Sequence, residues 1–374
     1  MEKNSDGQKG LSRRDFLKIS SFAGVTAIGG YLLSEYTPWL NYDKQVVQSR
    51  SPLSNDSQNA AKMREMVRYA TLAANGHNTQ PWKFAIKEKS IEIHPDYTRR
   101  LPVVDPNDRE MWISLGCALE NLLITARSAG YSTEVIYPSM NEYIEIQIRP
   151  DTPQGGNLFN AIPMRQNTRS EYSGQLISTS DYDQLQQIAL DPGVSLDFAA
   201  TPDKIEMFLE YVNQGNLKQY ADSAFINELI FWLRFNKKEA LSTMDGLYSR
   251  CSGNPEVPRW LGKSFVSGTK PEQQADADAK KLRSSSGAFV ISSETDDKTG
   301  WVRTGQVYER IALLMTTLNI QSAFLNQPIE MKEVRGQFQQ ALGLGNSMPQ
   351  LLVRFGYADP LPQSLRRPVD QVLI

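Results

Sequence analysis

The spacing of apolar residues over the first 150 positions predicts two helices and four strands. Apolar residues recur at helical spacing over 60–74, where Asn75-Gly76 follows as a helix stop, and again over 111–129. Four shorter runs have the alternating pattern of half-buried strands. These expected strands cover 82–86, 90–94, 133–137 and 143–148. Together these elements predict an α+β unit.

A similar order of elements begins again near Ile162. After a polar loop at 164–172, helices are expected around 185–190, 203–214, 225–235 and 300–318, with strands at 194–198, 287–292 and 351–355. The order helix, strand, helix, strand therefore occurs twice, which suggests an internal duplication. The segment 236–286 interrupts the second copy, and its Gly, Ser, Pro, Gln and Ala-Asp content suits a mobile, lid-like surface insertion.

The first 40 residues have the features of an export signal. Arg13-Arg14 precede a mildly apolar run, 19–33, which is shorter than the roughly 20 residues of a membrane-spanning helix. This pattern resembles a twin-arginine (Tat) signal, which implies passage through the Tat translocase to the periplasm or to the outer face of the cytoplasmic membrane. The alternative is an Arg-Arg pair on an ordinary amphipathic helix. Because no A-x-A cleavage site follows, the apolar run is also a candidate membrane anchor.

The polar residues 41–59 show turn signals and no apolar periodicity, so we expect a linker there. Arg50 lies within this linker, and its replacement is expected to leave ligand binding unchanged. The two halves of the duplication are expected at 60–160 and 161–374.

Composition excludes several classes of function. The 374 residues carry 40 Lys and Arg against 42 Asp and Glu, a formal charge of −2, so no basic field is present to attract nucleic acid. Two Cys and two His are too few for a zinc site of four such ligands or for a disulfide scaffold, and we expect no metal. An ordinary hydrophobic content of 40% fits a globular protein.

The most distinctive polar stretch is Asn75-Gly76-His77-Asn78-Thr79-Gln80-Pro81-Trp82. It lies between an expected helix end and an expected strand start, where free backbone N–H groups and fixed side chains suit a planar polar ligand. The alternative is a simple turn followed by an edge strand with a core tryptophan, and local physics does not separate the two interpretations.

Six motifs, taken in order, resemble the nitroreductase family of FMN-dependent flavoproteins. They are His77–Trp82, Ser114–Leu122, Arg165–Arg169, Asn326–Glu330, Gly356-Tyr357 and Leu365–Asp370. The resemblance covers roughly residues 60–374 and is closer to the tandem, Acg-type branch, in which two nitroreductase-like halves in one chain mimic the usual homodimer. It implies an α+β, nitroreductase-like fold of two pseudo-symmetric halves, and a monomer in place of the homodimer.

The resemblance also implies one FMN per chain and a set of cofactor-binding residues. Arg165, with Arg366 or Arg367, would hold the phosphate through charge-assisted bonds, and Arg169 would favour negative charge on the reduced ring. The Asn326-Gln327 loop would approach the flavin N5. The full expected set is Asn75, Gly76, His77, Asn78, Arg165, Gln166, Asn167, Arg169, Asn326, Gln327, Arg366 and Arg367.

Two departures from the family pattern bear on activity. Typical members have Pro-Ser where this chain has Asn75-Gly76, and an acidic residue followed by Gly where it has Asn326-Gln327. The resemblance therefore supports FMN binding better than NAD(P)H-dependent nitroreduction. The expected function is an exported FMN oxidoreductase that transfers hydride or electrons at flavin N5, with a small molecule or a quinone-type redox partner. The alternative is a protein that binds or sequesters FMN without turnover. No catalytic residue is assigned.

Overall fold

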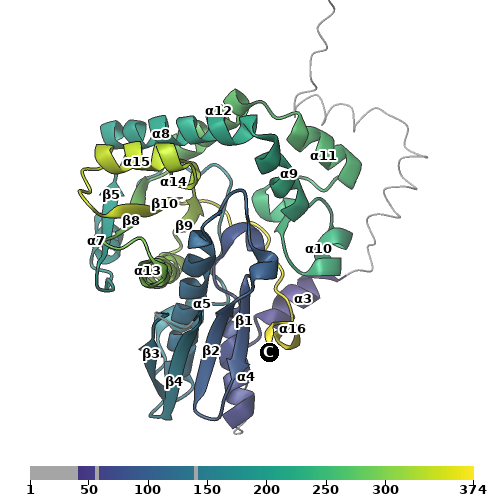
Figure 1. Cartoon of the computed structure of the whole chain (residues 1–374), viewed down its shortest axis with the longest axis vertical. Coiled ribbons are helices and arrows are strands. Elements are labelled where there is room, and N and C mark those ends of the chain that lie inside the picture. Colours follow the sequence, from purple (N-terminus) through teal and green to yellow (C-terminus); the bar gives the residue numbers. More distant parts are fainter. Residues whose placement is uncertain (1–40, 55–58, 139–141) are drawn as a thin grey trace, which may run out of the picture.

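The computed structural model describes residues 41–54, 59–138 and 142–374 (Figure 1). The expected export signal, with its twin arginines and apolar run, lies outside these residues. Over the ranges just given, no helix combines the length and the apolar character needed to cross a membrane.

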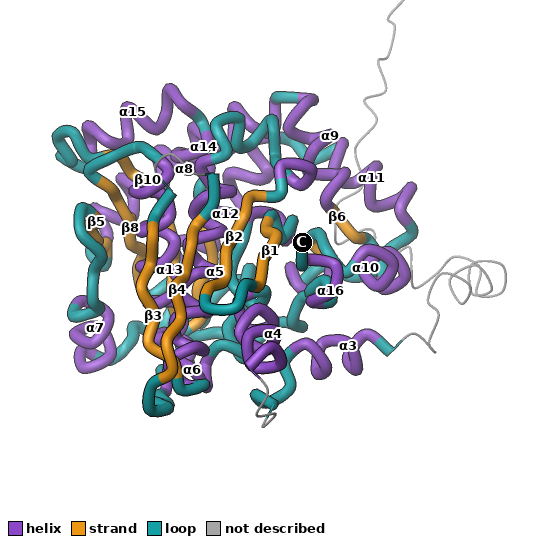
Figure 2. Tube along the Cα trace, turned by 60° about the horizontal axis from the view of Figure 1, so that its bottom comes forward, coloured by secondary structure: helices purple, strands orange, loops and turns teal. Residues whose placement is uncertain are grey.

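The first half is a four-stranded antiparallel sheet covered on one face by two helices. Its strand order is β1-β2-β4-β3, and Figure 2 shows these strands side by side. The strands are β1 (Trp82–Ile86), β2 (Ser90–Pro95), β3 (Tyr131–Ile136) and β4 (Ile144–Pro150). Helices α4 (Asn59–Ala70) and α5 (Arg109–Ser128) bury Met66, Val67 and Leu115 in the same core as the strands. Alternate strand residues face this core, which is why an alternating sequence pattern predicted them.

The second half repeats this topology. Its antiparallel sheet has the order β5-β8-β10-β9. In both sheets, therefore, the spatial order across the sheet is first, second, fourth and third strand, counted along the chain. The strands are β5 (Val194–Ala199), β8 (Gly287–Ser293), β9 (Gln321–Phe324) and β10 (Met348–Gly356). Helix α13 (Lys298–Thr317) follows the second strand of its sheet, as α5 does in the first half. The repeat confirms the predicted α+β architecture of two pseudo-symmetric halves.

The two halves meet where α5 packs on α13, in the middle of Figure 1. A Cβ atom on Gly305 of α13 would lie 2.0 Å from the carbonyl oxygen of Ile113. A Cβ on Gly116 of α5 would lie 2.0 Å from the carbonyl oxygen of Val302. Only glycine permits this backbone contact between helices, so these two residues set how closely the halves approach.

A long connection distinguishes the second half from the first. Three residues, 87–89, join β1 to β2, whereas β5 and β8 are separated by residues 200–286. In Figure 1 this connection runs along the top of the molecule and down its right side. It contains α8 (Pro202–Ala221), α9 (Ser223–Trp232), β6 (Leu233–Arg234), α10 (Lys237–Thr243), β7 (Leu247–Tyr248), the 3-10 turn η3 (Ser249–Ser252), α11 (Arg259–Ser267) and α12 (Pro271–Arg283).

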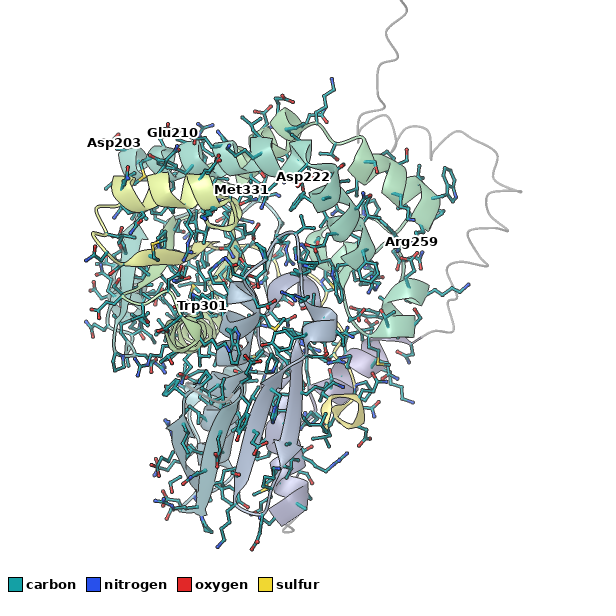
Figure 3. All side chains as sticks on the ribbon, in the orientation of Figure 1. Asp203, Glu210, Asp222, Arg259, Trp301 and Met331 are labelled. Carbon is teal, nitrogen blue, oxygen red and sulfur yellow. The ribbon has the colours of Figure 1, made fainter. Side chains whose placement is uncertain are left out.

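The segment 236–286 is therefore more ordered than its composition suggested. In α12 the buried residues are Ala275, Asp278, Ala279 and Leu282, which form one helical face against α8. Because two of these residues are alanines among polar neighbours, the face carries little hydrophobic signal. Arg259, labelled in Figure 3, ties α11 to α10 through an ion pair of 2.9 Å with Glu239.

The chain segments at either end of the described structure pack on the body. The expected linker 41–59 contains a helix, α3 (Tyr42–Ser49), whose first turn is capped by the side chain of Asn41. At the other end, α16 (Val369–Val372) leads to a bridge between Leu373 and Phe84 of β1. The backbone N–H of Ile374 donates to the carbonyl oxygen of Phe84 over 3.0 Å. The C-terminal tail thus returns from the second half to the first.

The remaining helices are short or lie at the rim of the sheets. They are α6 (Asn157–Ala161), α7 (Thr179–Gln186), α14 (Gln327–Glu330) and α15 (Lys332–Ala341). Asp296, at the turn between β8 and α13, fixes α15 to this turn by accepting two bonds of 2.9 Å from Arg335. It also accepts bonds from Gln350 and from the indole of Trp301, which is labelled in Figure 3.

Candidate functional site

A pocket lined by arginines lies where the two halves, the long connection and the C-terminal tail meet. It occupies about 540 Å³, including its open mouth. Its expected residues are Asn75 and Asn78 from the first half and Arg165, Gln166, Asn167, Arg169 and Arg366 from the second. The other lining residues are Arg50, Ala74, Gly246, Leu247, Tyr248, Cys251, Ser252, Pro362 and Ser364. We call this hollow the arginine pocket.

Arg165 is buried in the wall of the pocket, in the loop between α6 and α7. Its Nε lies 3.0 Å from Oε1 of Glu309 on α13, and its Nη2 donates to the carbonyl oxygen of Leu72. Its Nη1 is buried and has no hydrogen-bond acceptor among the residues that the structure describes. Burial by itself would lower the pKa of Arg165, but Glu309 beside it raises that pKa above the ordinary value. A buried charged donor without an acceptor is costly, so this atom is suited to an anionic ligand.

Arg366 enters from the C-terminal tail and is held by neutral oxygen atoms. Its Nε and Nη2 donate to the carbonyl oxygens of Thr71 and Leu72, and its Nη1 donates to Oδ1 of Asn78 over 2.9 Å. Burial lowers the pKa of Arg366 well below its ordinary value, and the charges of Arg50 and Arg165 lower it further. Arg366 thus contributes a desolvated positive charge that forms no ion pair with a carboxylate in the described part of the chain.

Arg50 corrects the expectation that 41–59 is a linker remote from the ligand. Helix α3 folds back on the body, so that Arg50 lines the arginine pocket. Its Nη2 donates to the carbonyl oxygen of Ser364 over 3.0 Å, and its buried Nε has no acceptor. Burial lowers the pKa of Arg50 to about 10, and the nearby charge of Arg165 acts in the same direction.

Arg169 is half-buried at the pocket, and within the described ranges its guanidinium has no hydrogen bond or ion pair. The imidazole of His77 lies near enough that burial and the charge of Arg169 together lower the pKa of His77 to about 4. His77 is therefore neutral at pH 7. Its ring does not line the pocket itself.

The charge of the pocket determines what it can hold. Four arginines line it, and no lining residue is Asp or Glu. Glu309, which lies behind Arg165, forms an ion pair with Arg165 but does not line the pocket. Guanidinium groups recognise phosphate and carboxylate through charge-assisted hydrogen bonds, and a phosphate monoester carries nearly two negative charges. The arginine pocket is therefore chemically suited to a phosphate-class dianion.

The polar junction before β1 has an unusual backbone that the long connection holds in place. His77, Asn78 and Gln80 have φ values of 48°, 53° and 53°, in the left-handed region that non-glycine residues rarely adopt. The backbone N–H of Gly246 donates to the carbonyl oxygen of Asn78, and Nε2 of Gln80 donates to that of Met244. Such conformations persist where surrounding contacts determine them, and they cluster at functional sites.

Four expected residues, besides His77, lie away from the pocket. Asn326 accepts a bond from the backbone of β10, and Gln327 donates to Asp278 of α12. Arg367 donates to the carbonyl oxygens of Gln80 and Trp82, which leaves Arg366 as the tail arginine that lines the pocket. None of these three side chains lines the pocket that contains Arg165. The proposed role of the Asn326-Gln327 backbone stays a prediction.

Gly76, the fourth of these residues, lines a second, smaller hollow of about 200 Å³. A Cβ there would lie 3.7 Å from Oε2 of Glu110 on α5, so this carboxyl group lies beside the junction. Glu110 accepts from Arg109 over 2.9 Å and from Asn326 over 3.4 Å. Burial raises the pKa of Glu110 well above its ordinary value, and neighbouring Glu330 raises it further. No signal in the sequence distinguished Glu110 from other polar residues at a helix start.

Comparison with known proteins agrees with the sequence motifs. No family model matches the chain. It is 26% identical over 328 residues to the putative NAD(P)H nitroreductase Rv3131 of Mycobacterium tuberculosis H37Rv, covering 84% of this chain and 91% of that protein. It is 24% identical over 329 residues to the putative NAD(P)H nitroreductase acg of the same strain, covering 83% and 94%. These relatives support the nitroreductase family.

Among solved structures, the chain is similar to an FMN-bound nitroreductase from Bacteroides fragilis, at 15% identity and a TM-score of 0.34. The match covers 57% of this chain and 95% of that one. A second match is the FMN-dependent nitroreductase NfnB of Mycobacterium smegmatis, at 11% identity and a TM-score of 0.37 over 54% and 88% of the two chains.

Proposed function

We propose that this protein is an FMN-dependent oxidoreductase of the nitroreductase family, and that the arginine pocket holds the FMN phosphate. The observation that carries the proposal is the group of four arginines at a pocket without a lining carboxylate. Two donors in this group, Nε of Arg50 and Nη1 of Arg165, are buried and have no acceptor. The phosphate of FMN supplies the oxygen atoms and the charge that these groups lack.

The residues present fit a cofactor shared between the two halves. Arg165 and Arg366 of the second half would bind the phosphate, and Asn75 and Asn78 of the first half would contact the adjoining part of the cofactor. Asn78 accepts a bond from Arg366, so the two contributions are already joined. Bound FMN would supply electron transfer at its ring. The chain's own part is to bind the phosphate, to fix the junction and to restrict the access of water.

The electron donor follows from location. Two relatives are named as putative NAD(P)H nitroreductases, and NAD(P)H is a cytoplasmic reductant. If Arg13-Arg14 direct export as we propose, the donor is instead a membrane quinol or a protein redox partner on the outer side. The α5–α13 contact joins two halves with the same sheet topology within one chain, so we also propose that the protein is a monomer, which its mass in solution will test.

The first experiment is the absorption spectrum of the purified full-length protein. A yellow protein that releases one FMN per chain on denaturation supports the proposal, whereas a colourless protein that binds no added FMN contradicts it. Anaerobic reduction followed by exposure to quinones or nitroaromatics then measures turnover. Rapid reoxidation is expected of an oxidoreductase.

The alternative function is sequestration of FMN. One observation favours it, because Gly246, Tyr248 and Cys251 of the long connection form part of the pocket wall. A reduced flavin that every acceptor fails to reoxidise would identify this function.

A further inference from the structure

The segment 41–50, which we call the arm, closes one side of the arginine pocket. Tyr42 is buried, and its hydroxyl group donates to the carbonyl oxygen of Gln363 over 2.9 Å. The same hydroxyl lies 3.5 Å from Sγ of Cys251, and the ring packs at 4.9 Å from that of Tyr248. Tyr248 and Cys251 are themselves pocket residues. The arm therefore touches both the long connection and the C-terminal tail at the point where they line the pocket.

The arm also carries charge into the pocket. Arg50 lines it together with Arg165, Arg169 and Arg366. The hydrogen bonds of Arg50 go to neutral oxygen atoms of Ser49 and Ser364. Among the described residues Arg50 forms no ion pair, and its hydrogen-bond acceptors are uncharged. Docking the arm thus brings a fourth positive charge close to three others.

This arrangement makes docking of the arm depend on what the pocket contains. Like charges in a partly desolvated site repel, and burial increases the repulsion because the surroundings screen it less than water does. When an anion with nearly two negative charges is bound, the net electrostatic interaction of Arg50 with the pocket changes from repulsion to attraction. The anion also supplies acceptors for Nε of Arg50 and Nη1 of Arg165. The contacts of Tyr42 favour docking in either state, so the anion alters the balance between docked and undocked arms.

We propose that the arm is a phosphate-dependent clasp, in which Arg50 joins Arg165 and Arg366 as a ligand of the bound anion and the arm docks stably only when a phosphate-class dianion fills the pocket. The proposal rests on the proposed function for the identity of the ligand, FMN. It adds a binding residue that does not belong to the recognised motifs, and it couples cofactor loading to the segment that joins the body to residues 1–40. Recognition depends on the phosphate and not on the flavin ring.

The test is hydrogen–deuterium exchange of the full-length protein, followed by mass spectrometry of peptides from the arm. The flavin-free protein is compared with protein saturated with FMN, with riboflavin, and with inorganic phosphate. We expect FMN to slow exchange in the arm by about tenfold or more and inorganic phosphate to slow it at higher concentration. Riboflavin, which lacks the phosphate, is expected to leave the arm unchanged.

Two variants match each other in charge and position. Arg50→Ala removes the ligand, and we expect it to abolish the protection by FMN and to weaken FMN binding by about tenfold. Lys44→Ala removes a positive charge from the exposed face of the same arm, and it should retain both the protection and the affinity. Exchange elsewhere in the body reports whether each variant is folded.

The outcomes separate this proposal from the proposed function. Protection by inorganic phosphate in a protein that binds no FMN supports the clasp and refutes the FMN assignment. FMN that binds with full affinity while the arm exchanges at an unchanged rate refutes the clasp alone. Equal protection by riboflavin and FMN also overturns the clasp, because the phosphate would then have no part in it.

Discussion

Removing the guanidinium of Arg165 tests whether the arginine pocket binds a phosphate. Of its three nitrogen atoms, Nε faces Glu309 and Nη2 donates to Leu72, so Nη1 is the atom left to bind a ligand. One charge-assisted hydrogen bond contributes about 1.5–3 kcal/mol, which corresponds to a ten- to hundredfold change in affinity. We therefore expect Arg165→Ala to weaken FMN binding by a factor in this range.

The single substitution also affects stability, because Glu309 would lose its buried partner. Breaking a buried ion pair costs about 3–5 kcal/mol when the remaining charge cannot be relieved. Burial already raises the pKa of Glu309, and loss of Arg165 would raise it further, so part of this cost would be relieved by uptake of a proton. The double variant Arg165→Ala/Glu309→Gln removes both charges. We expect it to restore most of the stability while the FMN affinity stays low.

The assay is a calorimetric titration of flavin-free protein with FMN and, in parallel, with riboflavin. If Arg165 contacts the phosphate, the affinity for FMN falls while the affinity for riboflavin does not. A matched control is Arg64→Ala, which removes an exposed arginine whose partner is Asp370 on the surface. An equal loss of affinity for both flavins would refute the phosphate assignment, and so would unchanged binding of FMN by the double variant.

Three further predictions concern the packing of the halves, acid stability and export. In urea denaturation, Gly305→Ala should lower the free energy of unfolding by about 3 kcal/mol, because its Cβ has no space between the central helices. Gly336→Ala, at an open helical position, should raise it by about 0.5–1 kcal/mol. Burial by itself would raise the pKa of Asp296, but hydrogen bonds from Arg335, Gln350 and Trp301 lower it below its ordinary 3.8. Its stabilisation is therefore fully present above pH 3.8 and is lost as the pH falls through the lowered pKa of the folded protein. Asp296→Asn should cost about 1 kcal/mol at pH 7 and a smaller amount at pH 2, which unfolding curves at both pH values will check. Replacement of Arg13 and Arg14 by lysine should retain the protein in the cytoplasm, and unchanged fractionation would contradict the export prediction.

The sequence predicted the elements whose hydrophobic pattern is strong. The β1–β2 hairpin and the helices α5 and α13 were expected within a few residues of their observed bounds, because their buried positions carry large apolar side chains. Strand β9 was missed because it has four residues, too few for a clear alternation. In the long connection, helices α8 and α9 were expected, at 203–214 and 225–235, whereas α10, α11 and α12 were missed. In α12, small or polar residues such as Ala275 and Asp278 occupy the buried face.

The candidate site was predicted where motifs are local and missed where the fold brings distant residues together. The loop Arg165–Arg169 and the tail Arg366 reach the pocket from positions that the motifs indicated. Arg50 and Cys251 belong to segments without any motif, and their presence depends on how the arm and the long connection fold over the body. The sequence could not indicate which of Arg366 and Arg367 lines the pocket, because this depends on which side of the tail faces Asn78.

The return of the C-terminal tail to β1 has a consequence for the order of folding. Leu373 and Ile374 contact Phe84, which lies far earlier in the chain, and Arg366 reaches the pocket on the same tail. Closing so long a loop costs conformational entropy before its contacts are gained, so the tail is expected to dock after both halves have formed. The arginine pocket is therefore completed late in folding. A chain whose tail is detached would lack both the bridge to β1 and one wall of the pocket, so cofactor occupancy would report that the tail has docked.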